Sequence, residues 1–194
     1  RGLGDVYKRQ CRARISGEKN FLGCVDYSDL YYDWANRVIE GVLARFPDKW
    51  FGCLAYSEVA APPRHVSVHP RLIPYMTYDR MKWTDPELRG TGQALTQDWH
   101  ARSPLLGWYD YIYGSPYCLP RVWFHRMADY YRFGYANGVR AMYAEAYPNW
   151  GEGPKLYVSL KLQWDPSADV DALLDEWYVR CVGEEGAPYL KQYY

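Results

Sequence analysis

Four short apolar segments recur along the chain at intervals of roughly thirty residues, which is the size of a βαβ unit. Helical patterns separate the last three: Asp85 and Pro86 mark the start of a helix that runs to about Arg102, and Asn137-Gly138 marks the end of another. This alternation predicts an α/β fold, in which a parallel sheet carries helices outside it. The four predicted strands are residues 50–57, 72–78, 107–120 and 139–146.

The remaining predicted helices flank these strands. The first starts at Ser28 or Asp26 and ends before Pro47, and its apolar residues form one broad stripe at helical spacing. That stripe contains Leu30, Trp34, Val38, Val42 and Phe46, with Tyr31, Ala35, Ile39 and Leu43 beside them. Three more helices are predicted at residues 120–136, 154–164 and 165–183, with Ser167 or Asp169 near the start of the last one.

Two parallel architectures fit this order, a doubly wound sheet and a barrel. No G-x-G-x-x-G or P-loop motif follows any of the strands, which weakens a nucleotide-binding sheet. The sequence therefore favours a (β/α) barrel, and four strands make half of a (β/α)8 TIM barrel. We assign residues 11–166 to its C-terminal half and residues 167–194 to an additional helical segment.

The composition narrows the class of partner. Aromatic residues make up 18% of the chain, with 21 Tyr and 9 Trp but only 5 Phe, so the excess lies in rings that carry a polar group. The formal net charge is zero, which argues against nucleic acid or an anionic membrane as partner. The five Cys show no C-x-x-C pair, and no His has metal-ligand spacing, so no disulfide framework, metal or cofactor is expected.

The predicted strand ends supply the candidate site residues, because barrels place active sites at the C-terminal ends of their strands. Each end delivers at least one carboxylate and one ring. Rings stack on the C–H faces of sugars, while charged groups bind their hydroxyls, so we expect a glycan site. We predict Asp110 and Glu145 as catalytic residues that face one cavity; the predicted substrate-binding residues are Tyr56, Glu58, Tyr78, Arg80, Trp108, Tyr113, Tyr143 and Trp150.

The segments "AYSEVAAPP", "NGVRAMYAEA" and especially "YVSLKLQWDPSADVDALLDEWYVRCVG" resemble the bacterial domain-of-unknown-function 4838 family. The resemblance covers nearly everything from Cys11 onward. It implies a glycosidase-like (β/α)8 barrel, related in layout to α-glucuronidases and β-hexosaminidases, with some members acting as endo-β-N-acetylglucosaminidases by a retaining, substrate-assisted mechanism. It also implies a secreted, periplasmic or cell-surface location in bacteria.

The predicted function is therefore that of a fragment of a glycoside hydrolase that cleaves hexosamine- or uronate-containing glycans. The alternative is a carbohydrate-binding barrel without catalytic activity. The partner of this half would be the missing N-terminal half of the barrel, which is expected to hold the general acid. The fragment alone is expected to be inactive and to aggregate or behave as a molten state, because half a barrel has two open strand edges and an uncovered sheet interior.

The two ends of the chain are not typical of a whole protein. Residues 5–10, "DVYKRQ", match the translation of a sequencing adapter, so residues 1–10 are interpreted as an artefact and left out of the fold. The last residues, "APYLKQYY", lie inside a predicted helix that lacks a cap. We therefore interpret the chain as a gene fragment.

Overall fold

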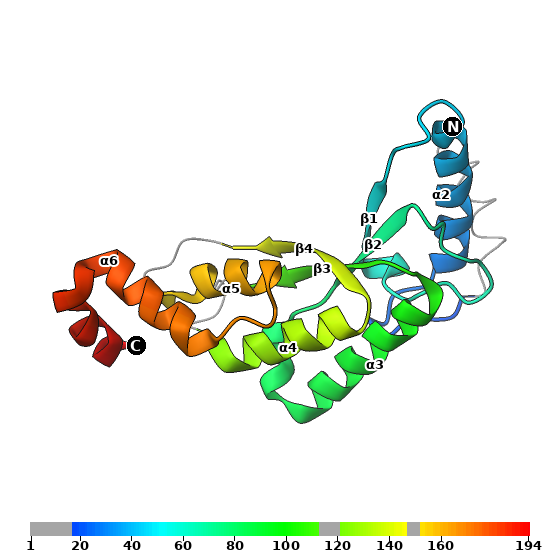
Figure 1. Cartoon of the computed structure of the whole chain (residues 1–194). Coiled ribbons are helices and arrows are strands. Elements are labelled where there is room, and N and C mark those ends of the chain that lie inside the picture. The colour runs from blue at the N-terminus through cyan, green and yellow to red at the C-terminus, as the bar shows by residue number, and fades with distance from the viewer. Residues whose placement is uncertain (1–16, 113–120, 147–151) are drawn as a thin grey trace, which may run out of the picture. The chain divides into compact units, whose positions relative to one another are not determined.

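The computed structural model describes residues 17–112, 121–146 and 152–194, and Figure 1 shows the elements. These residues form two compact units. Unit 1 contains the residues up to Thr77 together with Gln93–Tyr109 and Gly138–Tyr143, and unit 2 contains Tyr78–Gly92, Asp110–Asn137 and Ala144–Tyr194. The elements are α2 (Ser28–Leu43), β1 (Phe51–Ala55), η1 (Ser57–Val59), β2 (Leu72–Thr77), η2 (Arg80–Thr84), α3 (Pro86–Arg102), β3 (Leu106–Tyr111), α4 (Phe124–Ala136), β4 (Val139–Glu145), α5 (Lys155–Trp164) and α6 (Val170–Tyr193).

The four strands form one sheet in the order β1-β2-β3-β4. The pairs β1–β2 and β2–β3 are parallel, with Leu54 beside Tyr75 and Tyr75 beside Gly107. The predicted α/β fold with a parallel sheet is therefore confirmed, and each predicted strand coincides with an observed one. The third strand is shorter than predicted, since β3 ends at Tyr111.

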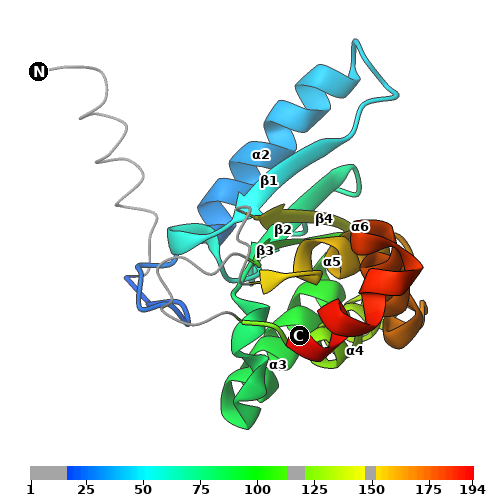
Figure 2. The same cartoon turned by 90° about the vertical axis from the view of Figure 1, so that its left-hand side faces the viewer.

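In unit 1, α2 and the second half of α3 cover one face of the sheet. Tyr32 of α2 lies against Cys53 of β1, with 3.9 Å between the hydroxyl oxygen and Sγ, and its ring meets the ring of Trp99 of α3 at 5.6 Å. Thr96 of α3 donates a hydrogen bond to the sulfur of Met76 of β2 at 3.7 Å. These side chains are buried and form the core of the unit. Figure 2 shows α2 running along β1.

The apolar stripe predicted for the first helix packs only along one edge, where Ala35 and Ile39 are buried beside Tyr32. The buried residues of α2 are Ser28, Tyr32, Ala35 and Ile39, whereas Trp34 is 57% exposed and Val38 is also exposed. The helix is apolar on two neighbouring rows, and only the row that contains Tyr32 meets the sheet. Helical spacing alone does not show which row of a broad apolar stripe is buried. In α2 it is the row that contains Tyr32, which packs against Cys53 of β1.

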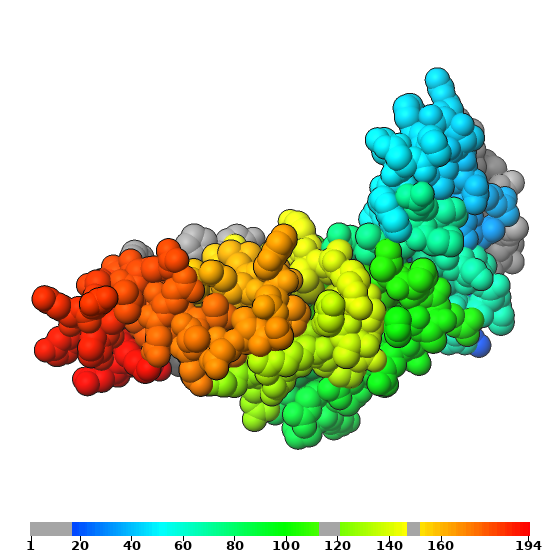
Figure 3. Space-filling view, in the orientation of Figure 1, coloured from blue at the N-terminus to red at the C-terminus, as the bar shows by residue number. Residues whose placement is uncertain are grey.

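Unit 2 is built around α4, α5 and α6, whose mutual contacts include an aromatic core. Trp83 of η2 meets the rings of Tyr130 and Phe133 of α4 edge to face, at 6.0 and 5.9 Å. The hydroxyls of Tyr131 in α4 and Ser159 in α5 are 2.7 Å apart. Figure 3 shows the atoms of α5 and α6 forming one continuous surface, in agreement with their contacts.

The predicted helix boundaries have clear local causes. Asp85 accepts hydrogen bonds from the backbone N–H groups of Glu87 and Leu88, and Asp169 accepts one from Ala172, so both act as N-caps. Gly138, at φ +82, follows the end of α4, and Gly183, at φ +76, interrupts α6 where the helix was predicted to end. Among the described helices, none is both long and apolar enough to cross a bilayer.

Candidate functional site

Six charged residues gather in unit 2 at and beyond the C-terminal ends of the strands. We call them the strand-end cluster. Asp79 and Arg80 follow β2, and Asp110 lies near the end of β3. The other members come from the segments after β3 and β4, and they are Arg121, Glu152 and Lys155. Five of the six are buried, and the side chain of Asp79 is 12% exposed.

Asp110 and Arg80 form the innermost pair. Their side chains are fully buried, with 3.8 Å between Oδ1 of Asp110 and Nη1 of Arg80. The backbone N–H groups of Arg80 and Tyr111 donate to the same Oδ1 at 3.2 and 2.9 Å. Arg80 also donates from Nη1 to the carbonyl of Tyr78 at 3.0 Å. Asp110 therefore fixes the loop after β2 against the end of β3.

Asp79 and Arg121 form the second pair, which is the one nearest to solvent. Nη1 of Arg121 lies 2.9 Å from both carboxylate oxygens of Asp79, and Nη2 donates to the carbonyl of Tyr111 at 2.9 Å. The guanidinium thus joins the loop after β2 to the end of β3. The side chains remain 12% and 9% exposed, so this pair reaches the surface of the unit.

Glu152 and Lys155 form the third pair, at the start of α5. Their side chains make an ion pair across one helical turn, and both are almost fully buried. The charge of Lys155 also interacts with those of Arg121 and Asp79. The three pairs are therefore parts of one electrostatic cluster rather than separate contacts.

Burial is the main influence on the titration of this cluster. It raises the pKa of Asp110, although the charge of Arg80 and the two backbone N–H groups oppose the shift. It lowers the pKa of Arg80 to about 10, and it lowers the pKa of Lys155 against the opposing effect of Glu152. Perturbed groups of this kind concentrate at functional sites, although buried structural ion pairs show them too.

Of the predicted site residues, Tyr78, Arg80, Asp110 and Glu145 lie in unit 2. The hydroxyl of Tyr78 donates to the carbonyl of Leu88 at 3.3 Å, and its ring lies edge to face with that of Trp83. Glu145 ends β4, is partly exposed, and accepts a backbone hydrogen bond from Ile112 through its carbonyl at 3.1 Å. Tyr78 and Arg80 thus lie in the packed loop after β2, where Arg80 contacts Asp110.

Tyr56, Glu58, Trp108 and Tyr143 lie in unit 1. Tyr56 and Tyr143 are more than half exposed, whereas Trp108 is fully buried. The pKa of Glu58 is lowered mainly because its carboxylate accepts a hydrogen bond from Ser57, which has a left-handed φ of 55. Tyr113 and Trp150 fall outside the described residues.

The two predicted catalytic carboxylates do not share a face of the sheet. Asp110 shares the buried face of Trp108, because residues two apart on a strand point the same way. Tyr109 points to the other face, where its ring stacks on that of Tyr143 at 4.8 Å, and alternation puts Glu145 on the face of Tyr143. The expectation that Asp110 and Glu145 face one cavity is therefore not met.

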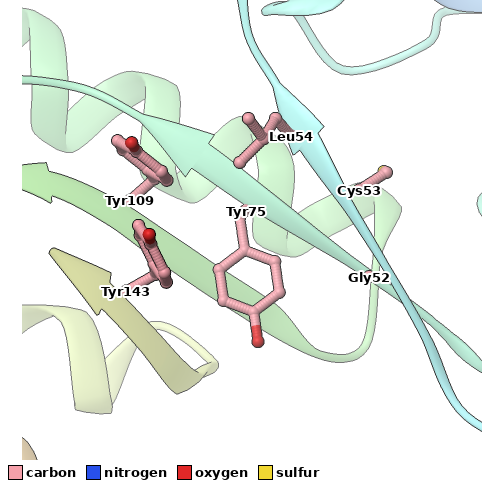
Figure 4. Close-up of a pocket in the computed structure, with 6 residues that line it drawn as sticks. All are labelled: Gly52, Cys53, Leu54, Tyr75, Tyr109 and Tyr143. Atoms are coloured by element: carbon pink, nitrogen blue, oxygen red, sulfur yellow. The ribbon is translucent and has the colours of Figure 1, made fainter. Parts of the chain in front are cut away.

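The face of the sheet away from α2 carries an aromatic surface that we call the open face (Figure 4). A hollow of about 450 Å³ is lined by Gly52, Cys53, Leu54, Tyr75, Tyr109 and Tyr143. Tyr75 lies over the backbone of its neighbours: a Cβ added to Gly107 would be 2.6 Å from Cδ1 of Tyr75, and one added to Gly52 would be 3.1 Å from Cε2. The glycines make room for this ring.

Comparison with known proteins adds one match. The sequence of residues 7–194 matches the family described as Domain of unknown function (DUF4838). The chain belongs to the DUF4838 family. The match begins at Tyr7, inside the segment attributed to an adapter. No curated protein and no solved structure matches the chain.

Sequence reasoning missed four of the six residues in the strand-end cluster of this DUF4838 chain. Asp79, Arg121, Glu152 and Lys155 were not selected as site residues. The Glu152–Lys155 pair had a signal, since opposite charges three residues apart at a helix start can pair. Arg121 had none, because it reaches Asp79, 42 residues away, only through the tertiary fold.

No metal centre is visible in the part of the chain that the structure describes, since no three His, Cys, Asp or Glu side chains converge there. Cys24, Cys53 and Cys181 are free thiols. The cluster consists instead of acids paired with bases. Such groups hold neutral polar ligands through charge-assisted hydrogen bonds, which are shorter and stronger than those between neutral groups.

Proposed function

We propose that this chain is the C-terminal half of a (β/α)8 barrel of the glycoside hydrolase type and that its strand-end cluster binds a hexosamine- or uronate-containing glycan. The observation that carries the proposal is the Asp79–Arg121 pair. It lies beyond the C-terminal ends of β2 and β3, the end at which barrel enzymes bind substrate. It is also the pair of the cluster that reaches solvent.

The Asp79–Arg121 and Asp110–Arg80 pairs differ in exposure, and we give them different roles. Arg121 holds Asp79 through Nη1, and a carboxylate is the kind of acceptor that binds sugar hydroxyls. Asp110 and Arg80 are fully buried, so they position the loop that carries Asp79. Of the two predicted catalytic carboxylates, Glu145 is the one that can approach a substrate, because it is partly exposed.

Exposed rings in unit 1 support a sugar ligand as well. Tyr143 is 57% exposed and stacks on Tyr109 with an angle of 25° between the rings. Parallel, exposed rings with polar tips are suited to the C–H faces of a pyranose. This support is independent of the charges in unit 2.

A binding module without catalytic activity is the second candidate function. One observation favours it: Asp79, Asp110 and Glu152 each have a cationic partner. A carboxyl group that serves as general acid must hold a proton near neutral pH, and a cationic partner works against this. The general acid of an enzyme would then come from outside the described residues.

Titration of the chain with two sets of oligosaccharides tests the proposal, one rich in N-acetylhexosamine and one rich in uronic acid. The chain should bind members of one set. Arg121→Gln should weaken that binding about tenfold to a hundredfold, because a hydrogen bond to a charged group contributes about 1.5–3 kcal/mol. Arg37→Gln, which alters an exposed pair on α2, is the control and should bind normally.

The results separate the candidates. Release of new reducing ends from the bound glycan identifies an enzyme, and binding without cleavage identifies a binding module. Absence of binding to both sets by the folded chain would contradict the proposed function. Equal affinity of the chain and Arg121→Gln would contradict the assignment of the cluster as the site.

A further inference from the structure

A second hollow in unit 1 shares no residue with the strand-end cluster or with the hollow of the open face. It has a volume of about 500 Å³ and lies between three segments, which are residues 19–21, residues 61–64 after η1, and the second half of α3. All three segments belong to unit 1. Sites for small molecules typically have volumes of about 300–1,000 Å³, so this hollow is large enough to hold one or two sugar residues.

Hydrogen bonds hold the walls of the hollow in place. Asn20 is buried, and its Nδ2 donates to the carbonyl of Ser57 at 2.6 Å, while its Oδ1 accepts two backbone N–H groups of its own turn. Trp99 of α3 donates from Nε1 to the carbonyl of Ala60 at 3.1 Å. These bonds join all three segments to the loop after β1. A ligand would therefore meet a preformed site, and little conformational freedom would be lost on binding.

Part of the lining is apolar. Leu95 and Pro63 are buried, and the ring of Phe21 is 41% exposed. Pro62 lies next to Pro63 in the same lining. Apolar and aromatic surfaces of this kind pack against the C–H groups on the face of a sugar ring.

The charged side chains of the lining leave a surplus of one positive charge. Arg64 makes an ion pair with Glu18, whereas no ion pair among the described residues includes Lys19, Arg102 or Asp98. Arg102 donates from Nη1 to the carbonyl of Arg64 at 3.3 Å, which holds its guanidinium at the hollow without neutralising it. Two cations and one carboxylate thus remain unpaired, and this balance favours a ligand with a single negative charge.

We propose that this hollow is a second sugar subsite and that it binds a uronic acid residue of the glycan. The uronate carboxylate pairs with Lys19 and Arg102 through charge-assisted hydrogen bonds. The sugar hydroxyls donate to Asp98, and one face of the ring packs on Phe21 and Pro62. Asp98 would repel a phosphate dianion or a polysulfated chain, so the lining favours a hydroxylated monocarboxylate over these anions.

This inference rests on the proposed function for the glycan as ligand, and it selects the uronate-containing class of the two that were proposed. Its test uses a disaccharide that contains glucuronic acid, together with the same disaccharide after reduction of the carboxylate to a primary alcohol. Both probes are titrated into the chain, Lys19→Gln and Arg102→Gln, with Arg37→Gln on α2 as the charge-matched control.

The same titrations are repeated with Arg121→Gln in each protein, so that the strand-end cluster contributes little to the binding that is measured. Far-ultraviolet circular dichroism verifies that each variant is folded. Lys19 and Arg102 are exposed, so their substitution should leave the fold intact.

The acidic probe should bind at least about tenfold more tightly than the reduced probe. Lys19→Gln and Arg102→Gln should each weaken its binding about tenfold, because each removes a hydrogen bond to a charged group. Arg37→Gln should have no effect, and binding of the acidic probe should persist when Arg121 is replaced.

Three results would overturn the inference: equal affinity for the two probes, affinity unchanged in both Lys19→Gln and Arg102→Gln, or complete loss of the acidic probe's binding in folded Arg121→Gln. Binding of an N-acetylhexosamine oligosaccharide that depends on Arg121, without binding of the acidic probe, would sustain the proposed function and still overturn this inference.

Discussion

Asp110 and Arg80 form a fully buried ion pair in which the carboxylate also accepts the backbone N–H of Arg80 itself, at 3.2 Å. Oδ1 of Asp110 thus contacts both the backbone N–H and the side chain of Arg80, in the loop after β2. The pair lies behind Asp79, the neighbour of Arg80 in the chain and the residue that reaches solvent. A substitution of Asp110 should therefore lower the stability of the fold before it affects ligand binding.

Asp110→Ala should lower the free energy of unfolding by about 3–5 kcal/mol, since it leaves the guanidinium of Arg80 and the backbone N–H groups of Arg80 and Tyr111 buried without their acceptor. Arg80→Met should have a similar cost, and the double variant should cost less than the sum. Denaturant unfolding of all three measures this. Asp33→Asn, which breaks the exposed pair with Arg37, should cost less than about 1 kcal/mol. Additive costs at Asp110 and Arg80 would show that the pair is not coupled.

The stability difference between the chain and Asp110→Asn should depend on pH. Burial raises the pKa of Asp110 above its ordinary value of 3.8, so the folded state keeps this proton at a higher pH than the unfolded state. The contribution of Asp110 to stability is then complete below about pH 3.8 and is lost as the pH rises through the folded pKa. Asp79, Tyr130 and Tyr131 also act on this site but remain in both proteins.

Measured between pH 3 and 7, the free energy of unfolding of the chain minus that of the variant should therefore decrease with rising pH and then become constant. An increase over the same range would mean that the folded pKa of Asp110 is lowered, and that Arg80 outweighs burial.

Gly107→Ala should destabilise unit 1, because the new Cβ would lie 2.6 Å from the ring of Tyr75. Movement of that ring would disturb the open face, so we expect a loss of about 1–3 kcal/mol, as for other overpacked sites. Gly90→Ala is the matched control: it lies in α3 with no atom within 4 Å of the added Cβ and should stabilise the helix by about 0.5–1 kcal/mol. Thermal unfolding of both variants measures the contrast, and an equal effect would contradict the role of Tyr75.

The strands were predictable from the sequence because their signals are local. The segment "LIPYMTY" has the length and composition of a strand, and Asp85 and Gly138 mark helix ends by their own chemistry. The faces were harder to predict. Alternation correctly groups Trp108 with Asp110, but it does not say which face the helices cover, and rings occur on both. Asp110 was therefore expected in an open cavity, although it lies on the buried face of the strand together with Trp108.

The site residues from loops could not be predicted for a different reason. Arg121 follows a segment without periodicity, and its position depends on a contact with Asp79, 42 residues away. Glu152 pairs locally with Lys155, but only the tertiary fold brings the charge of Lys155 near that of Asp79. A sequence shows that such charges exist but not which of them become buried together. The exposed row of α2, with Trp34 and Val38, shows the same limit, since an apolar helix face indicates burial without naming its partner.

Hydrogen–deuterium exchange of the chain with and without a bound oligosaccharide locates the ligand on the sequence and so shows whether it binds the strand-end cluster. We predict slower exchange in residues 78–84 and 152–158, the segments that carry Asp79 and Lys155, and no change in α2. Asp79→Asn should abolish the effect while its exchange without ligand stays as in the unaltered chain. Protection confined to β1 and β2, or unchanged exchange in residues 78–84 at saturating glycan, would contradict the assignment of the strand-end cluster as the glycan site.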